Sequence, residues 1–246
     1  MYKRQDIWIL NYFDNVIPDV TPISDDKVNL DFVVEEKKST QRINANLGFT
    51  GEYGITGGAG VEFDNFRGKG QKLNIGASTG TNFSIYTTQE PSKYRSLNIS
   101  FQDPMINDSP YLVGASIFYS FRGSSTNYYF PLDFTVGGAV ASFGRRLEWP
   151  DDFFRVMWSA KFMQKEYEGS QSDIDNYIGG LQKTRGISLS QVLSRDSRNR
   201  AEFPTNGSTF ILENTYSGGF LGGNENFQKH MLTLDWFTPT FSKFVL

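Results

Sequence analysis

The chain has 246 residues, and its 24 Lys and Arg nearly balance its 27 Asp and Glu, which gives a formal net charge of −3. No excess of positive charge supports the counterion-release binding that nucleic-acid proteins use, so nucleic acid is excluded as a partner. The absence of cysteine excludes a disulfide scaffold, a thiolate metal site and a cysteine nucleophile.

Hydropathy argues against membrane-spanning helices and leaves membrane-spanning strands open. The mean hydropathy is −0.42, and no stretch approaches the roughly 20 consecutive apolar residues that a spanning helix needs. A spanning strand is apolar on one face only, so its average hydropathy is near neutral. The 24 glycines and the 22 Phe and 12 Tyr, against only 4 Trp, fit strands of that kind.

The first residues lack the apolar segment that directs export. Met1 to Asp6 contains no such run, so we expect that the protein stays inside the cell or that its true beginning is missing. Ile7 to Phe13 is expected to be the end of a helix. Val28 to Glu35 alternates apolar and polar residues as a short strand does, ahead of the charged run Glu35 to Lys38. Together these segments indicate the tail of a small α/β domain.

The rest of the chain alternates with a period of two. From Leu73 to Tyr86, residues such as Leu73 and Ile75 fall on one side and residues such as Asn74 and Gly76 on the other. The same pattern predicts ten strands: Ile43 to Phe49, Ile55 to Asp64, Leu73 to Tyr86, Arg95 to Asp103, Leu112 to Arg122, Val136 to Leu147, Phe153 to Glu166, Thr184 to Ser194, Ser208 to Ser217 and Lys229 to Thr238.

The length of these segments and their connections favour a membrane barrel. Many segments have about ten residues, which is longer than the roughly five to six of soluble sheets and close to the roughly nine to eleven of a tilted membrane strand. One face is crowded with Gly, Ser and Asn, which a barrel lumen tolerates. Short turns alternate with longer polar loops such as Gly123 to Thr135 and Tyr167 to Lys183, as periplasmic turns alternate with extracellular loops. The short turns are Asn65 to Gly70, Asp103 to Tyr111, Glu148 to Asp152, Asp196 to Gly207 and Pro239 to Ser242.

Four phrases resemble the bacterial surface antigen family, the BamA/TamA outer-membrane assembly factors. Tyr12 to Val16 followed by Val28 to Glu35 resembles the close of the last POTRA domain, which is the periplasmic module of that family. The other three resemble turns of the family barrel, after strands two, four and eight. Their motif residues are Asn65, Phe66, Gly68 and Gly70; Phe101, Asp103 and Pro104; and Asp196, Arg198, Phe203, Pro204 and Gly207.

The resemblance implies a fold and a location. Residues 1–38 are expected to be the remnant of the last POTRA domain, in the periplasm. Residues 39–246 are expected to be the N-terminal part of an all-β, antiparallel transmembrane β-barrel of the bacterial outer membrane, with about ten of roughly sixteen strands.

The resemblance also implies a function. The family inserts and folds other outer-membrane barrels without ATP, through a seam that opens sideways so that a substrate strand pairs with the first barrel strand. The implied partners are the outer-membrane lipid bilayer, nascent outer-membrane β-barrel proteins and accessory assembly lipoproteins. In this chain the first strand comprises Arg42, Ile43, Asn44, Ala45, Asn46, Leu47, Gly48 and Phe49.

Two family features have no counterpart here. These are the arginine-bearing loop that folds back into the lumen and the final strand that ends in an aromatic residue. Lys243 to Leu246 reads as the opening of an eleventh strand, and an open sheet edge is costly in lipid because its polar groups lack partners. We therefore expect the sequence to be truncated, with Met1 to Gln5 as an artefact of its assembly.

Signatures of catalysis and metal binding are weak, so we expect no enzyme, no cofactor and no metal. His230 is the only histidine, which leaves no zinc set and no His-based triad. Asp173, Asp175 and Asn176 lack the Gly and the closing Glu of a calcium loop and fit a solvated loop. Gly68-Lys69-Gly70 lacks the Walker spacing and fits a tight turn.

Three alternatives stay open. The first is a TamA-like or two-partner-secretion transporter, which exports its substrate. The second is a plain barrel that acts as a porin, adhesin or lipid hydrolase, although the POTRA-like start and the lack of a Ser/His pairing argue against it. The third is a soluble β-sandwich, which would dissolve without detergent. For the turn motifs, fastening a turn is the simplest role, because turn chemistry alone explains Pro and Gly there.

Overall fold

The computed structural model describes residues 12–24, 27–37, 41–50, 54–81, 93–124, 130–200, 203–241 and 244–245. Within them, no helix is both long and apolar enough to cross a membrane. Short helical segments are η1 (Ile106–Asp108), α2 (Gln171–Ile178) and η3 (Gly219–Leu221). The strands are β1 (Phe13–Ser24), β2 (Lys27–Glu36), β3 (Gln41–Thr50), β4 (Gly54–Phe66), β5 (Gln71–Thr81), β6 (Lys93–Asp103), β7 (Tyr111–Arg122), β8 (Asp133–Arg146), β9 (Phe154–Glu168), β10 (Lys183–Asp196), β11 (Gly207–Ser217) and β12 (Phe227–Phe237).

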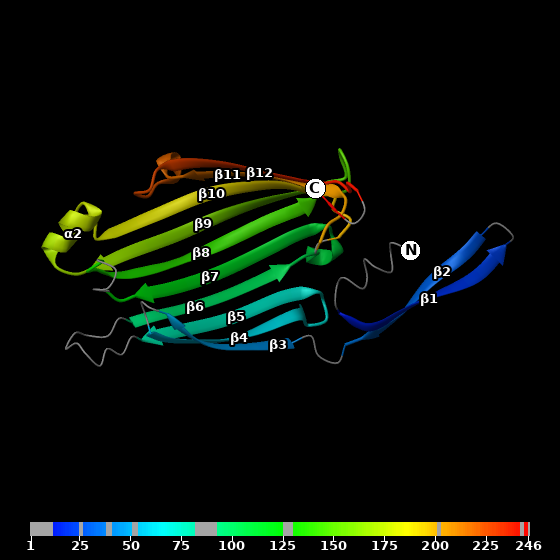
Figure 1. Cartoon of the computed structure of the whole chain (residues 1–246), viewed down its shortest axis with the longest axis horizontal. Helices are drawn as coiled ribbons and strands as arrows, with labels where there is room; N and C mark the ends of the chain where they lie inside the picture. The colour runs from blue at the N-terminus through cyan, green and yellow to red at the C-terminus, as the bar shows by residue number, and fades with distance from the viewer. Residues whose placement is uncertain are drawn as a thin grey trace.

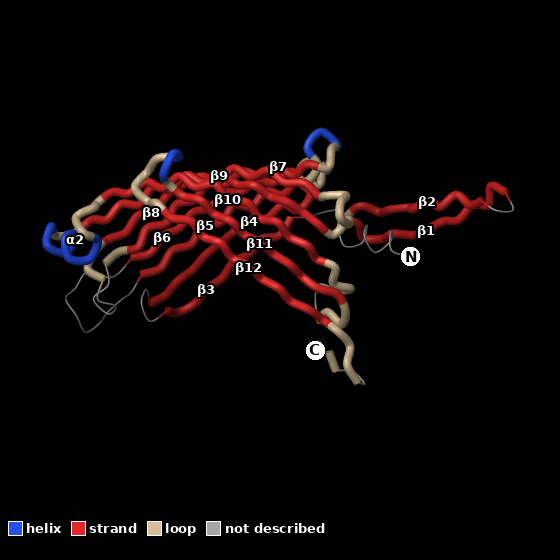
Figure 2. Tube along the Cα trace, turned by 90° about the horizontal axis from the view of Figure 1, so that it is seen from above, coloured by secondary structure: helices blue, strands red, loops and turns tan. Residues whose placement is uncertain are grey.

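Strands β3 to β12 form one antiparallel sheet in which every strand pairs with its neighbours in sequence (Figure 1). These strands correspond to the ten that the alternating pattern predicts, although residues 82–86 of the predicted strand Leu73 to Tyr86 lie outside the described residues. Figure 2 shows the sheet curved into an arch with β3 and β12 at its two edges. The arch is not closed, because β3 pairs only with β4 and β12 only with β11 in the described part of the chain. Strands β1 and β2 form a separate hairpin.

The register gives the sheet one polar and one apolar face. Ser116 of β7 lies opposite Ser100 of β6, and the next residue, Ile117, lies opposite Ile99. The ladder continues this division across the sheet, so we name the two sides the polar face and the apolar face. Because residues alternate between the two faces along each strand, every second side chain of a strand lies on the apolar face and the others lie on the polar face.

The exposure of the two faces is the reverse of that in a soluble protein. Ile117 is 53% exposed, whereas Ser116 on the polar face is partly buried. Large apolar side chains are also exposed on the outer strands of the sheet, with Leu47 at 82% and Leu234 at 65%. The described residues include only four buried apolar side chains, which are Val16, Leu132, Val156 and Ile174. No second sheet packs against the apolar rows in the described chain, which argues against the soluble β-sandwich.

The connections divide between two rims. The turn rim carries the connections β4–β5, β6–β7, β8–β9 and β10–β11, and the loop rim carries β3–β4, β5–β6, β7–β8, β9–β10 and β11–β12. The hairpin β1–β2 lies at the turn-rim end (Figure 1). Tyr12, just before the hairpin, donates a hydrogen bond from its hydroxyl to the carbonyl of Gly70 in the β4–β5 turn, at 3.3 Å. The motif-bearing turns and the hairpin therefore share one end of the sheet. Length alone does not separate the rims, because residues 51–53 join β3 to β4 on the loop rim whereas residues 197–206 join β10 to β11 on the turn rim.

The structure corrects two expectations. Phe13 begins strand β1 and is not helical, while Ile7 to Asn11 lie outside the described residues. Sequence analysis did not predict β1, which contains Pro18 and Pro22. Residues two or four apart point their N–H to the same side of a strand, so both prolines can sit on its free edge.

The loop from Tyr167 to Lys183 is the other correction, because it contains a helix that was not predicted, although Asp175 and Asn176 are exposed as expected of a solvated loop. It contains α2, which Ser170 caps by accepting a hydrogen bond from the Asp173 N–H at 3.2 Å. Ile174 of α2 is fully buried, and Phe130 packs edge-on against Tyr177 at 6.0 Å. An eight-residue amphipathic turn is too short for sequence periodicity to separate from a loop.

We predict that charge on the apolar face is costly only in a bilayer. Ile117→Arg should destabilise the protein in lipid by about 2–4 kcal/mol, because the apolar face would bury a guanidinium in hydrocarbon. Ser116→Arg places the same group on the polar face and is the matched control. Unfolding titrations in liposomes measure both variants, and equal effects would contradict the assignment of faces.

Candidate functional site

The first strand of the sheet, β3, is an exposed edge. All ten of its residues are exposed, and Ile43 and Phe49 are 81% and 78% exposed. Alternate residues of β3 point their N–H and C=O groups away from β4, as in any edge strand. This row of backbone donors and acceptors is a template to which another strand can pair.

Pairing between β3 and β4 is poor in side-chain contacts. Five of its ten residue pairs contain a glycine, namely Asn44↔Gly60, Asn46↔Gly58, Leu47↔Gly57, Gly48↔Thr56 and Thr50↔Gly54. Cross-strand side-chain pairs contribute roughly 0.2–1 kcal/mol each, and a glycine removes that contribution. At the opposite edge of the sheet, only one of the eleven β11–β12 pairs, Gly207↔Phe237, contains a glycine. Strand β12 is also held by a 2.6 Å hydrogen bond from Thr209 to Asp235.

One end of β3 is fastened by charge. Arg42 forms ion pairs with Glu62 at 3.0 Å and with Asp64 at 2.9 Å, both on β4. Arg42 lies at the turn rim, whereas the glycine-containing pairs continue toward the loop rim. Strand β3 is therefore held at its turn-rim end and weakly held beyond it.

The β4–β5 turn joins this fastened end to the hairpin. The Gly70 N–H donates to the Asn65 side chain at 2.6 Å, and Gly68 and Gly70 have φ values of +69° and +65°. Phe66 packs edge-on against Phe63 at 5.8 Å. Burial, and secondarily the negative charge of Asp64, raise the pKa of Tyr12 above its usual value. The motif residues Asn65, Phe66, Gly68 and Gly70 therefore all shape one turn.

The β6–β7 turn uses its motif in a similar way. Asp103 accepts a hydrogen bond from the Met105 N–H at 3.0 Å and another from the Gln71 side chain at 2.7 Å. The first bond closes an Asx turn around Pro104, and the second ties this turn to β5. Phe101 lies two residues back on the apolar face of β6, opposite Leu73 and Ala115.

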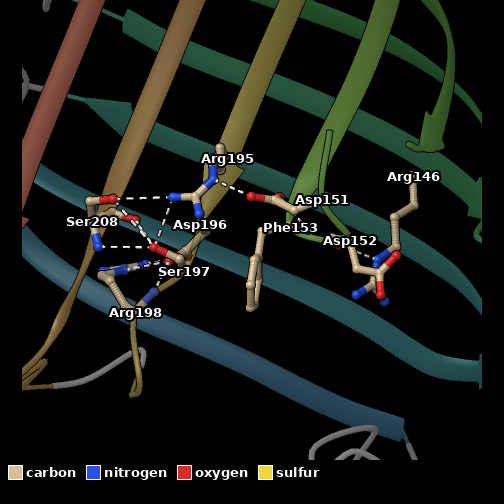
Figure 3. Close-up of polar contacts among 9 residues, drawn as sticks. All are labelled: Arg146, Asp151, Asp152, Phe153, Arg195, Asp196, Ser197, Arg198 and Ser208. Atoms are coloured by element: carbon tan, nitrogen blue, oxygen red, sulfur yellow. Dashed lines mark hydrogen bonds and ion pairs between the residues drawn. The ribbon is translucent and has the colours of Figure 1, made fainter. Parts of the chain in front are cut away.

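The β10–β11 connection holds the largest polar network of the turn rim (Figure 3). Asp196 and Arg198 form an ion pair at 2.7 Å, as their spacing in the motif allows. Arg195 reaches across to Asp151 of the β8–β9 turn at 2.8 Å and donates to Ser197 at 3.0 Å. The network thus links two consecutive turns of the rim.

Arg195 and Asp151 were not singled out by sequence reasoning. No motif marks Asp151, and only the register that brings the two turns together reveals the pair. Desolvation acts to raise the pKa of Asp151, but hydrogen bonds from Arg195 and from the Phe153 N–H outweigh it and hold that pKa below its usual value.

Phe203, Pro204 and Gly207 form the second half of the motif in the β10–β11 connection, and they differ in their surroundings. Gly207 has φ of +107°, and a Cβ there would lie 2.3 Å from the Ser197 carbonyl oxygen, so only glycine fits. Phe203 has φ of +52° and is 87% exposed, so its side chain is mostly uncovered. Pro204 lies between them. The motif residues named here and above all lie on the turn rim, in or next to the connections β4–β5, β6–β7 and β10–β11.

Comparison with known proteins finds one matching protein family and matching solved structures. The Omp85 superfamily domain matches residues 65–246. No curated protein matches. Among solved structures, the crystal structure of BamA from Haemophilus ducreyi lacking POTRA domains 1–3 superimposes with a TM-score of 0.64 at 17% sequence identity. The match covers 98% of this chain and 46% of that chain, so this chain spans about half the length of the BamA structure.

We predict that Arg42→Gln loosens the turn-rim end of β3. Amide hydrogens of Gln41 to Asn44 should exchange about two- to fivefold faster, which corresponds to the roughly 0.5–1 kcal/mol of a partly exposed ion pair. Arg42→Lys keeps the charge and should recover part of the protection. In the parent protein, Leu47 to Phe49 should already exchange faster than Gln41 to Ile43. Uniform exchange along β3 would contradict the asymmetry.

We predict that Gly207→Ala destabilises the protein by about 3 kcal/mol, because it adds a backbone clash to an unfavourable φ. Gly68→Ala is the control, since Gly68 has φ of +69° but nothing within 4 Å of its would-be Cβ. That change should cost about 1 kcal/mol. Denaturant midpoints in micelles measure both, and equal midpoints would refute the role of the clash.

Proposed function

The chain belongs to the Omp85 superfamily, and we propose that it serves as an outer-membrane protein assembly factor that offers β3 as a template edge to incoming strands of nascent β-barrel proteins. The observation that carries this proposal is the exposed, glycine-opposed edge of β3. The proposed role is not enzymatic and needs no cofactor. It requires only an exposed strand at the edge of the sheet, and β3 is such a strand.

Recognition at such an edge depends mainly on the backbone. A substrate strand that pairs with β3 gains main-chain hydrogen bonds whatever its sequence, while side chains on alternate faces contribute selectivity. This suits a factor that must accept many barrel sequences. The exposed apolar residues Ile43, Leu47 and Phe49 would lie on the same face as the apolar residues of an incoming membrane strand.

The weak β3–β4 pairing supports a reversible template. A strand with few side-chain contacts can adjust its register or tilt at low cost, whereas a well-paired edge such as β12 resists such change. Arg42 keeps the turn-rim end in place through Glu62 and Asp64. We propose that β3 yields first toward the loop rim and stays anchored at the turn rim.

The hairpin β1–β2 supports placing the turn rim in the periplasm, as the remnant of a POTRA domain. A two-stranded hairpin is marginally stable alone and needs a covered apolar face. Its register gathers one such face, composed of Val16, Pro18, Val20, Pro22, Val28, Leu30, Phe32 and Val34. The opposite face pairs Asp19 with Asp31 and Thr21 with Asn29, and carries one apolar pair, Ile17 with Val33. This amphipathic division is typical of a strand pair that belongs to a larger domain.

We predict that photo-crosslinkers at Asn44 and Asn46 in the complete protein capture a nascent outer-membrane barrel in growing cells. These positions lie on the edge strand, so a paired substrate strand would be within reach. A crosslinker at Ser116, in the middle of the sheet on the polar face, is the control and should capture far less. Equal capture at all three positions, or none at Asn44 and Asn46, would rule out the template role.

A further inference from the structure

Two arginines lie on the apolar face of the sheet near the turn rim, and they differ in how their charge is compensated. Arg195 of β10 is paired with Asp151 at 2.8 Å, as Figure 3 shows. Arg145 of β8 has no such partner. Within the described chain, no side chain or backbone group accepts a hydrogen bond from it, and its Nε is buried without an acceptor. Near the turn rim, the apolar face therefore carries one neutralised and one uncompensated guanidinium.

Packing holds the side chain of Arg145 in place. Its guanidinium carbon lies 5.3 Å from the ring centre of Tyr111, its partner in the β7–β8 ladder. Tyr111 stacks on Phe143 at 5.5 Å, and Phe143 stacks on Trp158 at 6.1 Å. On the other side Arg145 lies opposite Val156, which is only 7% exposed. Because its Nε is shielded, the terminal nitrogens are the donors that a ligand would meet.

The surroundings of Arg145 determine which ligand fits. An uncompensated cation facing hydrocarbon is costly, so long cationic side chains near strand ends extend to the interface and pair with an anion there. Stacked Tyr, Phe and Trp side chains mark the headgroup level of a membrane barrel. The anion found at that level is the phosphate of a phospholipid, and arginine binds phosphate through parallel N–H···O hydrogen bonds.

We propose that Arg145 and Tyr111 form a binding site for the phosphate of a phospholipid in the leaflet at the turn rim. The site rests on the proposed membrane placement of the apolar face, but not on the template role of β3. The acyl chains of the bound phospholipid would extend along the apolar face toward Phe143 and Trp158. Arg195 does not compete for the lipid, because Asp151 already neutralises it.

The test compares three variants of the complete protein purified in dodecyl maltoside. Native mass spectrometry measures the apparent affinity for the first bound palmitoyl-oleoyl phosphatidylglycerol. Arg145→Gln should weaken binding about tenfold, which is the loss of charge-assisted hydrogen bonds to one phosphate. Arg145→Lys keeps the charge without the planar fork and should fall between. Arg146→Gln makes the same charge change one residue along, on the polar face, and should stay within about twofold of the parent.

Any other pattern of affinities would contradict the proposed phosphate site. Unchanged affinity in Arg145→Gln would remove it, and equal losses in Arg145→Gln and Arg146→Gln would reduce it to a general charge effect. Competition with inorganic phosphate separates the two sources of a phosphate group. Displacement of the lipid by low millimolar phosphate would assign the site to the free ion and refute the lipid. Crosslinking at Asn44 in the same variants reports the template role separately, so the two proposals fail independently.

Discussion

A strand that lies in hydrocarbon must pair all of its backbone polar groups with neighbouring strands and turn apolar side chains outward. In this chain the sheet β3–β12 meets the second demand in large part, since Ile117, Phe143 and Leu234 are exposed on the apolar face and Ser100 and Ser116 lie on the polar face. The first demand is met everywhere except at the two edges. The inverted arrangement of faces and the exposed edges are therefore two consequences of the same constraint.

The two edges are not equivalent, and the difference lies in side chains. Strand β12 keeps a side chain in ten of its eleven pairs with β11, whereas half of the β3–β4 pairs contain a glycine. Backbone hydrogen bonding alone would make the two edges equally firm. The glycines of β4 thus weaken the pairing of β3 with β4. At the turn rim, Arg42 of β3 still forms ion pairs with Glu62 and Asp64 of β4. An edge that is held at one end and weak at the other suits repeated pairing and release.

The sequence predicted the features that depend on local pattern, namely the strands of the sheet and the turns between them. The ten strands of the sheet follow from period-two alternation, and the roles of Gly68, Gly70 and Gly207 follow from turn chemistry. It did not predict β1, where Pro18 and Pro22 fit a strand only on a free edge, and the sequence does not reveal which edge is free. It also missed the Arg195–Asp151 pair and the uncompensated Arg145, since both depend on which strands become neighbours. The proposed function of the β3 edge came from a family resemblance and not from periodicity.

The central claim is that side chains along each strand face lipid and a polar interior by turns, and the cysteine-free chain allows a direct measurement. Single cysteines placed at each position of β7 from Val113 to Ser120, in protein reconstituted into liposomes, would be labelled with a water-soluble maleimide. We expect labelling at Gly114, Ser116, Phe118 and Ser120 and protection at Val113, Ala115, Ile117 and Tyr119, with brominated lipids quenching probes at the protected positions. Uniform labelling, or the opposite alternation, would contradict it.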